Sequence, residues 1–254
     1  MFSNFYRTPR VTNSPSLSTS QERKATMNVI AFGATALITK TGRGSVMKQA
    51  AEESRHEVLF ERKIYELLGP HPRIARYIGP VVHTVELEFY ENGCIDQLKM
   101  KRPEFEVPYL RWAEQIAEGL VFLHSNNVVH CDLRSANILV TDSLDLVLAD
   151  FASSCLNGER VSYITNKTRY RPGSCEFPYD YSFTIQDDFF AFGSVLYNLI
   201  TSKDPYADLE DHEVIKLYNS GTFPDVSELP MSTIMSKCWC GEYSSATQLL
   251  EDIR

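Results

Sequence analysis

The stretch that decides the fold is Val129–Val140, which reads VHCDLRSANILV. Asp132 lies two positions after a histidine, Asn137 lies five positions after Asp132, and three apolar residues end the stretch. A second motif, LADFA, begins at Leu148 and places Asp150 eighteen positions after Asp132. The segments ILV and LVL between the two acids indicate short strands around a Thr-Asp-Ser turn. A hairpin is therefore predicted to separate the two carboxylates in sequence.

These two motifs resemble the catalytic loop and the D-F-G segment of protein kinases. In that family the loop aspartate accepts or orients the proton of the substrate hydroxyl, and the asparagine holds a metal ion on the phosphates. The resemblance implies that Asp132 is the catalytic base and that Asn137 and Asp150 are metal ligands. Oxygen ligands of this kind suit Mg²⁺, with Mn²⁺ as an alternative. Arg134 is expected to contact the γ-phosphate.

The segment on the N-terminal side of these motifs reads as a small sheet with one helix. NVIAF, ALITK and SVMK predict a three-strand meander, and ARYIGPVV and TVELEFY predict two further strands. Between them, residues 51–68 carry a helical pattern that ends at Gly69 and Pro70. The part of the chain up to about residue 90 is therefore rich in predicted strands.

The resemblance extends into this sheet-rich part. The segment from Ile30 to Ile38 stands where kinases carry a loop with three glycines, of which only Gly33 is present. Lys48 ends the next strand and is expected to pair with the α- and β-phosphates, restrained by Glu61 on the helix. Alternatives to Glu61 on or near the same helix are Glu52, Glu53 and Glu57.

Leu87 to Tyr90 resemble the hinge that faces adenine, with Leu87 in the gatekeeper position. Apolar residues from both halves are expected to sandwich the base. The residues that the resemblance assigns to the nucleotide are Ile30, Gly33, Ile38, Val46, Lys48, Leu87, Glu88, Tyr90 and Leu139.

The C-terminal half is predicted to be mainly helical, with one helix over 108–126 and others from about Asp187. DFFAFG, beginning at Asp188, resembles the start of the long central helix of protein kinases, whose aspartate anchors the catalytic loop. The segments that follow this helix also resemble those of protein kinases, and small-molecule kinases usually lack them. The resemblance therefore favours a protein substrate over a small molecule. The sequence thus predicts an α+β, bilobal kinase-like fold, with a flexible tail over 1–26, an N-lobe over 27–90 and a C-lobe over 91–254.

Four departures from the family pattern bear on activity. Cys131 replaces the arginine that pairs with an activation-loop phosphate, so we expect a constitutively competent enzyme without that switch. Ala152 replaces the glycine of D-F-G, which predicts altered loop flexibility. Gly173 stands in place of the glutamate of A-P-E, and the basic partner of that glutamate is also absent. Ala31 and Ala36 replace two loop glycines, which predicts weaker ATP binding.

The HCDL and DFA variants are most similar to the divergent fungal kinase-like proteins. The leading hypothesis is an ATP-dependent protein kinase that acts on a protein hydroxyl. The loop DLRSAN resembles that of tyrosine kinases, whereas the subgroup favours Ser/Thr, so Ser/Thr is slightly preferred over Tyr. The alternative is a pseudokinase that acts as a nucleotide-binding scaffold or interaction module, and a small-molecule kinase is a third reading.

The composition of the chain limits the other classes of function and the cellular locations that need to be considered. A net charge of −8 and a pI near 5.3 argue against a general nucleic-acid binder. Six scattered cysteines without a C-x-x-C pair indicate reduced thiols, so a cytoplasmic or nuclear location is expected. No apolar run approaches the roughly 18 residues of a membrane span. A mitochondrial presequence in the tail is conceivable, but Pro9 and Pro15 interrupt any amphipathic helix. The sequence gives no indication of oligomeric state.

Overall fold

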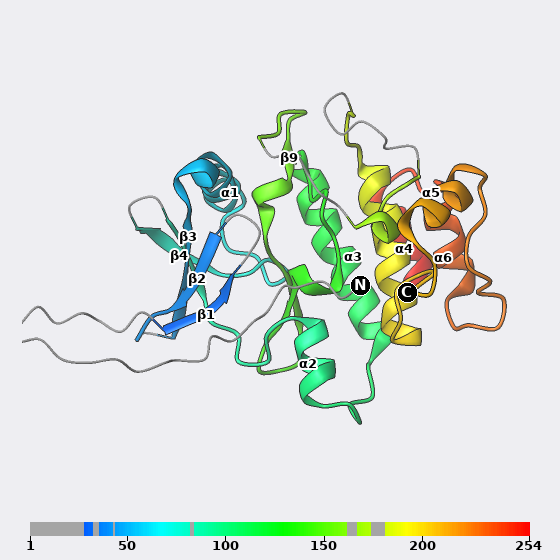
Figure 1. Cartoon of the computed structure of the whole chain (residues 1–254), viewed down its shortest axis with the longest axis horizontal. Helices are drawn as coiled ribbons and strands as arrows, with labels where there is room; N and C mark the ends of the chain where they lie inside the picture. Colours follow the sequence, from blue (N-terminus) through cyan, green and yellow to red (C-terminus); the bar gives the residue numbers. More distant parts are fainter. Residues whose placement is uncertain (1–27, 33–35, 43, 82–83, 162–166, 174–180) are drawn as a thin grey trace, which may run out of the picture.

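The computed structural model describes residues 28–32, 36–42, 44–81, 84–161, 167–173 and 181–254 (Figure 1). An antiparallel sheet with one helix forms the N-lobe, and a mostly helical C-lobe lies beside it. This arrangement confirms the predicted α+β bilobal fold. The tail over 1–26 and the glycine-loop residue Gly33 lie outside the described residues, so the predictions made for them stay predictions.

The N-lobe sheet has five strands in the order β1-β2-β3-β5-β4, which confirms the predicted meander and strand pair. Their bounds are β1 (Asn28–Phe32), β2 (Ala36–Lys40), β3 (Ser45–Ala50), β4 (Tyr77–Val81) and β5 (Thr84–Glu88). Lys48 lies on the central strand, opposite Ile38 of β2 and Val85 of β5. Neighbours on both sides therefore fix the position of its backbone.

Helix α1 (Arg55–Leu68) is the one helix of the described N-lobe. The prediction placed its start at residue 51, but Glu52–Ser54 form a 3₁₀ turn ahead of it. The helix ends at Gly69, whose φ of 62° is a conformation that glycine adopts without a steric cost. Val58, Glu61 and Leu68 recur at helical spacing on its buried face, and this face turns Glu61 toward the sheet.

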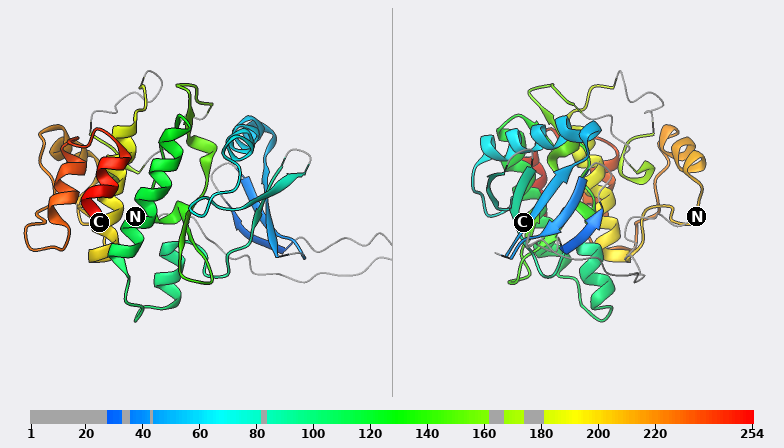
Figure 2. Two further views of the ribbon diagram at one scale, coloured as in Figure 1. Left: turned by 180° about the vertical axis from the view of Figure 1, so that it is seen from behind. Right: turned by 60° about the vertical axis from the view of Figure 1, so that its left-hand side comes forward.

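The C-lobe contains α2 (Ile95–Lys101), α3 (Tyr109–Ser125), α4 (Ile185–Thr201), α5 (Asp211–Asn219), α6 (Ser232–Trp239) and α7 (Ala246–Ile253). Helix α4 is buried along nearly its whole length and lies between α3 and α6, as Figures 1 and 2 show. The predictions of a helix over 108–126 and of later helices are confirmed. Helix α2 was not predicted, because it has only seven residues and begins after a cysteine cap. Among the described residues no helix combines the length and the apolar character needed to cross a membrane.

Two short strand pairs flank the catalytic loop. The predicted hairpin is present as β7 (Ile138–Val140) and β8 (Leu146–Leu148). A second pair joins β6 (Val128–Val129) to β9 (Cys155–Leu156), and the sequence analysis missed it because each strand has only two residues. Together the pairs hold the loop that carries Asp132 and the segment that carries Asp150 side by side.

The close packing of α4 on α6 makes a stability prediction. A Cβ added at Gly193 would lie 2.9 Å from Cys238 Cβ and 3.1 Å from Trp239 Nε1. We expect Gly193→Val to lower the free energy of unfolding by about 3 kcal/mol, because both neighbours are buried and must move. Urea unfolding measures this change. Gly42→Val is the control, since Gly42 has no atom within 4 Å of its added Cβ. Equal stability of the two variants would contradict the predicted clash.

Candidate active site

Asp188, at the start of α4, holds the backbone of the catalytic loop. Its Oδ2 accepts from the amide of His130 at 2.8 Å, and its Oδ1 accepts from the amide of Cys131 at 2.9 Å. Oδ2 also lies 2.9 Å from His124 Nε2. The side chain of Asp188 is fully buried. The donors around its carboxylate therefore replace the hydrogen bonds that it would make to water. The predicted anchoring role of Asp188 therefore has a direct geometric basis.

Cys131 adopts a backbone conformation that is unfavourable for a residue with a Cβ. Its φ is 63°, in the left-handed region. The bond from its amide to Asp188 helps to hold this conformation, and its thiol lies in a small buried cluster with Cys155. Burial raises the pKa of the Cys131 thiol. The position that carries a charged arginine in the family pattern is therefore a neutral, buried thiol in this chain.

The catalytic loop brings Asp132, Arg134 and Asn137 together. Arg134 Nε lies 3.1 Å and 3.2 Å from the two carboxylate oxygens of Asp132. The Asn137 amide donates to Asp132 Oδ2 at 2.7 Å and to the Asp132 carbonyl at 2.8 Å. Burial raises the pKa of Asp132, and the charge of Arg134 opposes that rise. The carboxylate is thus oriented by two side chains of its own loop.

An ammonium group joins the two lobes at this site. Lys48 Nζ lies 2.8 Å from Glu61 Oε2 on α1 and 2.5 Å from Asp150 Oδ1, which follows β8. Glu61 is fully buried, whereas the side chain of Asp150 is 42% exposed. Glu61 is thus the glutamate of α1 that contacts Lys48, and the alternatives Glu52, Glu53 and Glu57 are not required to explain this contact.

Lys48, Glu61 and Asp150 form a charged triad, in which each group shifts the pKa values of the others. Burial acts against the charged form of Lys48, but Asp150 and Glu61 together raise its pKa. Burial would raise the pKa of Asp150, but the neighbouring ammonium lowers it overall. For Glu61 burial dominates and raises the pKa, with Lys48 opposing. Lys48 therefore keeps the carboxylate of Asp150 ionised.

A chain of aromatic rings connects the sheet to the catalytic loop. Tyr77 of β4 stacks on Tyr65 of α1 with ring centroids 5.8 Å apart, and Tyr65 meets Phe151 edge-on at 4.9 Å. Phe151 then meets His130 at 5.3 Å. The sequence analysis missed Tyr65 and Tyr77, although Tyr65 lies one helical turn beyond Glu61, a signal that could have found it. The rings hold α1 and the Asp150 segment in one arrangement.

The D-F-A segment accommodates alanine without strain. Phe151–Ser153 form a 3₁₀ turn, and the residue with a left-handed backbone is Asp150, at φ 66° and ψ 70°. Ala152 is buried and has no positive φ. Because the conformation that favours glycine falls on Asp150, the change from glycine to Ala152 leaves this arrangement possible.

The apolar residues predicted to surround the nucleotide lie on strands of both lobes. Ile38 and Val46 are half-buried on β2 and β3, Leu87 is buried on β5, and Leu139 is half-buried on β7. Ile30 lies on β1 and is 42% exposed.

The hinge is fixed by the segment ahead of β4. Glu88 donates its amide to the Arg76 carbonyl, and the Tyr90 hydroxyl accepts from the Arg76 amide at 3.0 Å. The Tyr90 amide donates to no acceptor within the part of the chain that the structure describes. It is thus free to donate to an adenine nitrogen.

The oxygen atoms of the site fit a divalent cation. Asp150 Oδ2 and Asn137 Oδ1 accept no hydrogen bond from the described residues. Hard oxygen donors of this kind are the ligands that Mg²⁺ prefers. Within the described ranges no group of three His, Cys, Asp or Glu side chains could hold a metal alone. A metal here would therefore share its ligands with phosphate oxygens, and Asp150 and Asn137 would hold it.

The segment that lacks the A-P-E glutamate is anchored in another way. Arg169 Nη1 lies 2.5 Å from Asp211 Oδ1, and its guanidinium also donates to the Tyr206 and Leu209 carbonyls. A Cβ at Gly173 would lie 2.6 Å from Asn219 Oδ1, so α5 packs against the position where the glutamate would begin. Sequence reasoning missed Arg169, because its partners lie up to 42 positions away.

Two hydroxyl side chains between the D-F-A segment and Gly173, those of Ser154 and Thr168, are poorly accessible to a modifying enzyme. Ser154 is fully buried and donates to the His130 carbonyl, and Thr168 is also buried. Ser162, Tyr163 and Thr165 lie outside the described residues, and Ser153 is half-buried.

The bilobal fold, the anchored catalytic loop and the lysine bridge define the chain as a protein kinase domain. Residues 41–250 match the family described as protein tyrosine and serine/threonine kinase, and the chain belongs to this family.

Curated relatives agree with this assignment at low identity. The chain is 27% identical over 180 residues to the serine/threonine/tyrosine-protein kinase HT1 of Arabidopsis thaliana, covering 66% of this chain and 46% of that protein. It is 28% identical over 241 residues to mitogen-activated protein kinase kinase kinase 3 of Mus musculus, covering 86% and 38%. It is 28% identical over 195 residues to the tyrosine-protein kinase SPK-1 of Girardia tigrina, covering 69% and 38%. The chain thus spans less than half the length of these relatives.

The triad makes a prediction for stability. Lys48→Met leaves Glu61 and Asp150 facing each other without a cation. We expect the free energy of unfolding near neutral pH to fall by about 3 kcal/mol, the low end for a broken buried pair, because Asp150 is partly exposed. The loss should shrink near pH 5, because without the ammonium both carboxyl pKa values rise and protonation relieves the repulsion.

Urea unfolding at the two pH values measures this effect, with Lys63→Met as the control, since Lys63 is exposed on the same helix. In the wild type, folding lowers the pKa of Asp150 below its ordinary value of 3.8. The ionised carboxylate therefore contributes stability at pH values above 3.8, and this contribution is lost as the pH falls below 3.8. A loss for Lys48→Met that matched the control, or grew at acid pH, would count against the triad.

Proposed function

We propose that this chain is an ATP-dependent protein kinase that transfers the γ-phosphoryl group to a hydroxyl of a protein substrate. The observation that carries the proposal is the Lys48 ammonium between Glu61 and Asp150. This contact brings Lys48, the proposed phosphate-binding cation, together with helix α1 and with Asp150, the proposed metal ligand. Asp132 and Asn137 lie on the loop beside it, in mutual hydrogen-bond contact.

The proposed reaction is a direct displacement. The acceptor oxygen forms a bond to the γ-phosphorus, the bond from that phosphorus to the β–γ bridging oxygen breaks, and ADP leaves with the bonding electrons. Asp132 orients the acceptor hydroxyl and takes its proton, for which its carboxylate must be ionised. Arg134 lies beside Asp132 and supplies positive charge to the transferred group. A bound divalent cation neutralises phosphate charge, and Asp150 and Asn137 would hold it.

The finer assignments are part of the same proposal. The resemblance to the fungal kinase-like proteins supports a slight preference for Ser/Thr over Tyr, whereas the DLRSAN loop supports Tyr. The relatives include proteins named for serine/threonine, for tyrosine and for both activities. The buried, reduced state of most described cysteines is compatible with a cytoplasmic or nuclear protein.

A nucleotide-binding scaffold is the second candidate. The observation in its favour is the loss of two glycines from the phosphate loop, where a Cβ restricts the approach of backbone amides to phosphate. The intact set of Lys48, Asp132, Asn137 and Asp150 favours turnover, because a scaffold needs no oriented base.

Phosphoryl transfer to a protein acceptor tests the proposal. We expect γ-labelled ATP with Mg²⁺ or Mn²⁺ to label a generic protein mixture, and Asp132→Asn and Asp150→Asn to lower the rate by about 100-fold or more. Asp142→Asn is the matched control, since this aspartate is exposed in the β7–β8 turn. Identification of the labelled side chain distinguishes Ser/Thr from Tyr. Nucleotide binding without transfer by the wild type would move the function to the scaffold.

A further inference from the structure

Two buried thiols lie together beside the catalytic loop. Cys131 directly precedes the proposed base Asp132, and Cys155 lies on β9, in the segment that follows D-F-A. Both side chains are buried, and they form a small cluster that is separate from the main core. Within the part of the chain that the structure describes, no other two cysteines form such a cluster. The proposed phosphoryl transfer uses neither thiol.

The pairing of β6 with β9 brings the two cysteines together. Val129 of β6 lies directly opposite Cys155, and opposite residues of an antiparallel pair have side chains on the same face. The chain then turns at Cys131, whose Sγ donates to the Val129 carbonyl at 3.3 Å. The Cys131 thiol is thus folded back toward the residue that faces Cys155. Val129 and Phe183 pack against this pair of thiols.

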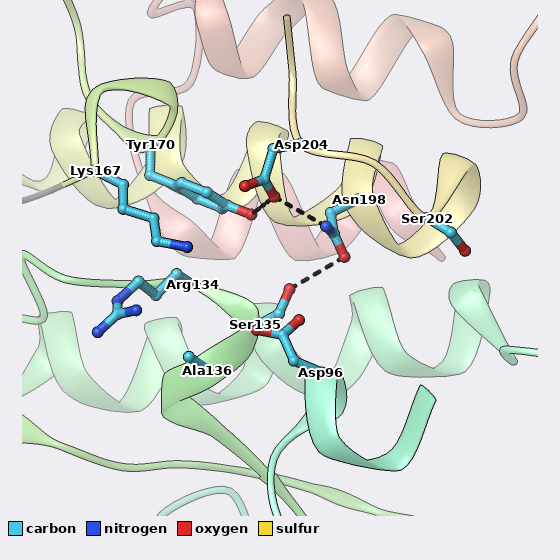
Figure 3. A pocket seen from close by; sticks show the side chains of 9 residues that line it. All are labelled: Asp96, Arg134, Ser135, Ala136, Lys167, Tyr170, Asn198, Ser202 and Asp204. Carbon is cyan, nitrogen blue, oxygen red and sulfur yellow. Dashed lines mark hydrogen bonds between the residues drawn. The ribbon is translucent and has the colours of Figure 1, made fainter. Parts of the chain in front are cut away.

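Helix α4 holds the loop that carries Cys131 at two points. Asp188 accepts from the Cys131 amide at 2.9 Å. Farther along the loop, Ser135 donates to Asn198, and Asn198 donates in turn to Asp204, as the dashed lines in Figure 3 show. The loop is therefore anchored on both sides of the proposed base. A movement that brings the two sulfur atoms to bonding distance must come mainly from β9.

Strand β9 is short and ends at an exposed turn. It has two residues, and residues 157–159 after it are exposed. The pairing with β6 and a hydrogen bond from Ser154 to the His130 carbonyl join it to the loop. Short segments beside exposed turns are among those that open locally with little free energy. Such an opening lets β9 shift and admits a small solute to Cys155.

We propose that Cys131 and Cys155 form a reversible disulfide when the protein meets hydrogen peroxide. The bond would join the catalytic loop to β9. In the family pattern, the arginine that Cys131 replaces joins the same loop to the activation segment through a phosphate. The disulfide would therefore supply a covalent link in place of that ion pair. A peroxide suits the buried site because it is small, whereas the disulfide of glutathione needs a much wider opening.

The proposed oxidation has two steps. The Cys155 thiolate attacks one peroxide oxygen, so that a sulfur–oxygen bond forms, the oxygen–oxygen bond breaks and the leaving oxygen departs as water. The Cys131 sulfur then attacks the resulting sulfenic acid, a sulfur–sulfur bond forms, and the hydroxyl leaves as a second water. Two thiols are oxidised, and one peroxide is reduced to two water molecules.

Cys155 is the thiol expected to react first. Burial raises the pKa of both thiols, but the charge of Arg160 opposes this rise at Cys155. At Cys131 the neighbouring negative charge of Asp188 adds to the rise. The exposed turn also lies on the Cys155 side of the cluster. Cys131 therefore acts as the resolving thiol.

Peptide mapping of the full chain tests this inference. Reduced protein is treated with a small excess of hydrogen peroxide, alkylated in denaturant and digested with trypsin without reductant. We expect residues 112–134, which contain Cys131, to be joined to residues 135–160, which contain Cys155. Dithiothreitol should separate the two peptides. The cross-linked protein should unfold at a temperature about 5 °C above that of the reduced protein, because the bond closes a loop in the unfolded chain.

Variants locate the bond and the order of its steps. Cys155→Ala, at a strand position, should abolish the cross-linked peptide. Cys131→Ser should also abolish it and leave a sulfenic acid on Cys155 that dimedone labels. Cys240→Ala removes an exposed thiol outside the cluster and is the control, which should keep the cross-link. Thermal unfolding in the presence of reductant shows whether each variant is folded.

Three results would overturn the inference. They are oxidation of Cys240 while Cys131 and Cys155 both remain open to alkylation, a disulfide from either of the two to another thiol or another chain, and a cross-linked protein that unfolds at a lower temperature than the reduced protein. None of these readouts depends on phosphoryl transfer. The disulfide and the proposed function are therefore tested separately.

Discussion

The arrangement of this site depends on one buried ammonium group. Lys48 stands between a carboxylate of the helix α1 and a carboxylate that follows β8, so it joins elements that no sheet or helix connects. Removing the cation would leave two like charges in a poorly solvated space. The aromatic chain from Tyr77 to His130 supports the same arrangement through apolar contact. The charge interactions and the aromatic packing therefore stabilise the same arrangement of the two lobes.

The departures from the family pattern become understandable beside this constraint. The left-handed backbone of the D-F-A segment lies at Asp150, so the alanine that follows costs little. The buried thiol of Cys131 occupies a strained backbone position that Asp188 holds in place through its carboxylate. Arg169 and the close approach at Gly173 anchor the segment before α4 without a buried glutamate. Each change thus removes a charged or flexible element while a neighbouring contact keeps the geometry.

The sequence predicted those parts of the site that are local in the chain. Asp132 and Asn137 share one loop, and the spacing to Asp150 follows from a hairpin with two short strands, so simple patterns sufficed. Lys48 and Glu61 could be assigned only by aligning the sequence with a known family, and the structure brings their side chains into contact. Tyr65, Arg169 and the pairing of Cys131 with Cys155 were missed, because they depend on partners that only the fold brings close. Helix α2 was missed because its signals are short and its cap is a cysteine.

We infer that the site is assembled without phosphorylation of the chain. The most direct measurement is the time course of phosphoryl transfer by protein that has been fully dephosphorylated and freed of phosphatase, recorded from the first turnover with intact-mass analysis alongside. We expect transfer to start linearly and without a lag, before any phosphate appears on the chain. A lag that shortens as the chain becomes phosphorylated would contradict it, because a switch would then be assembling the site.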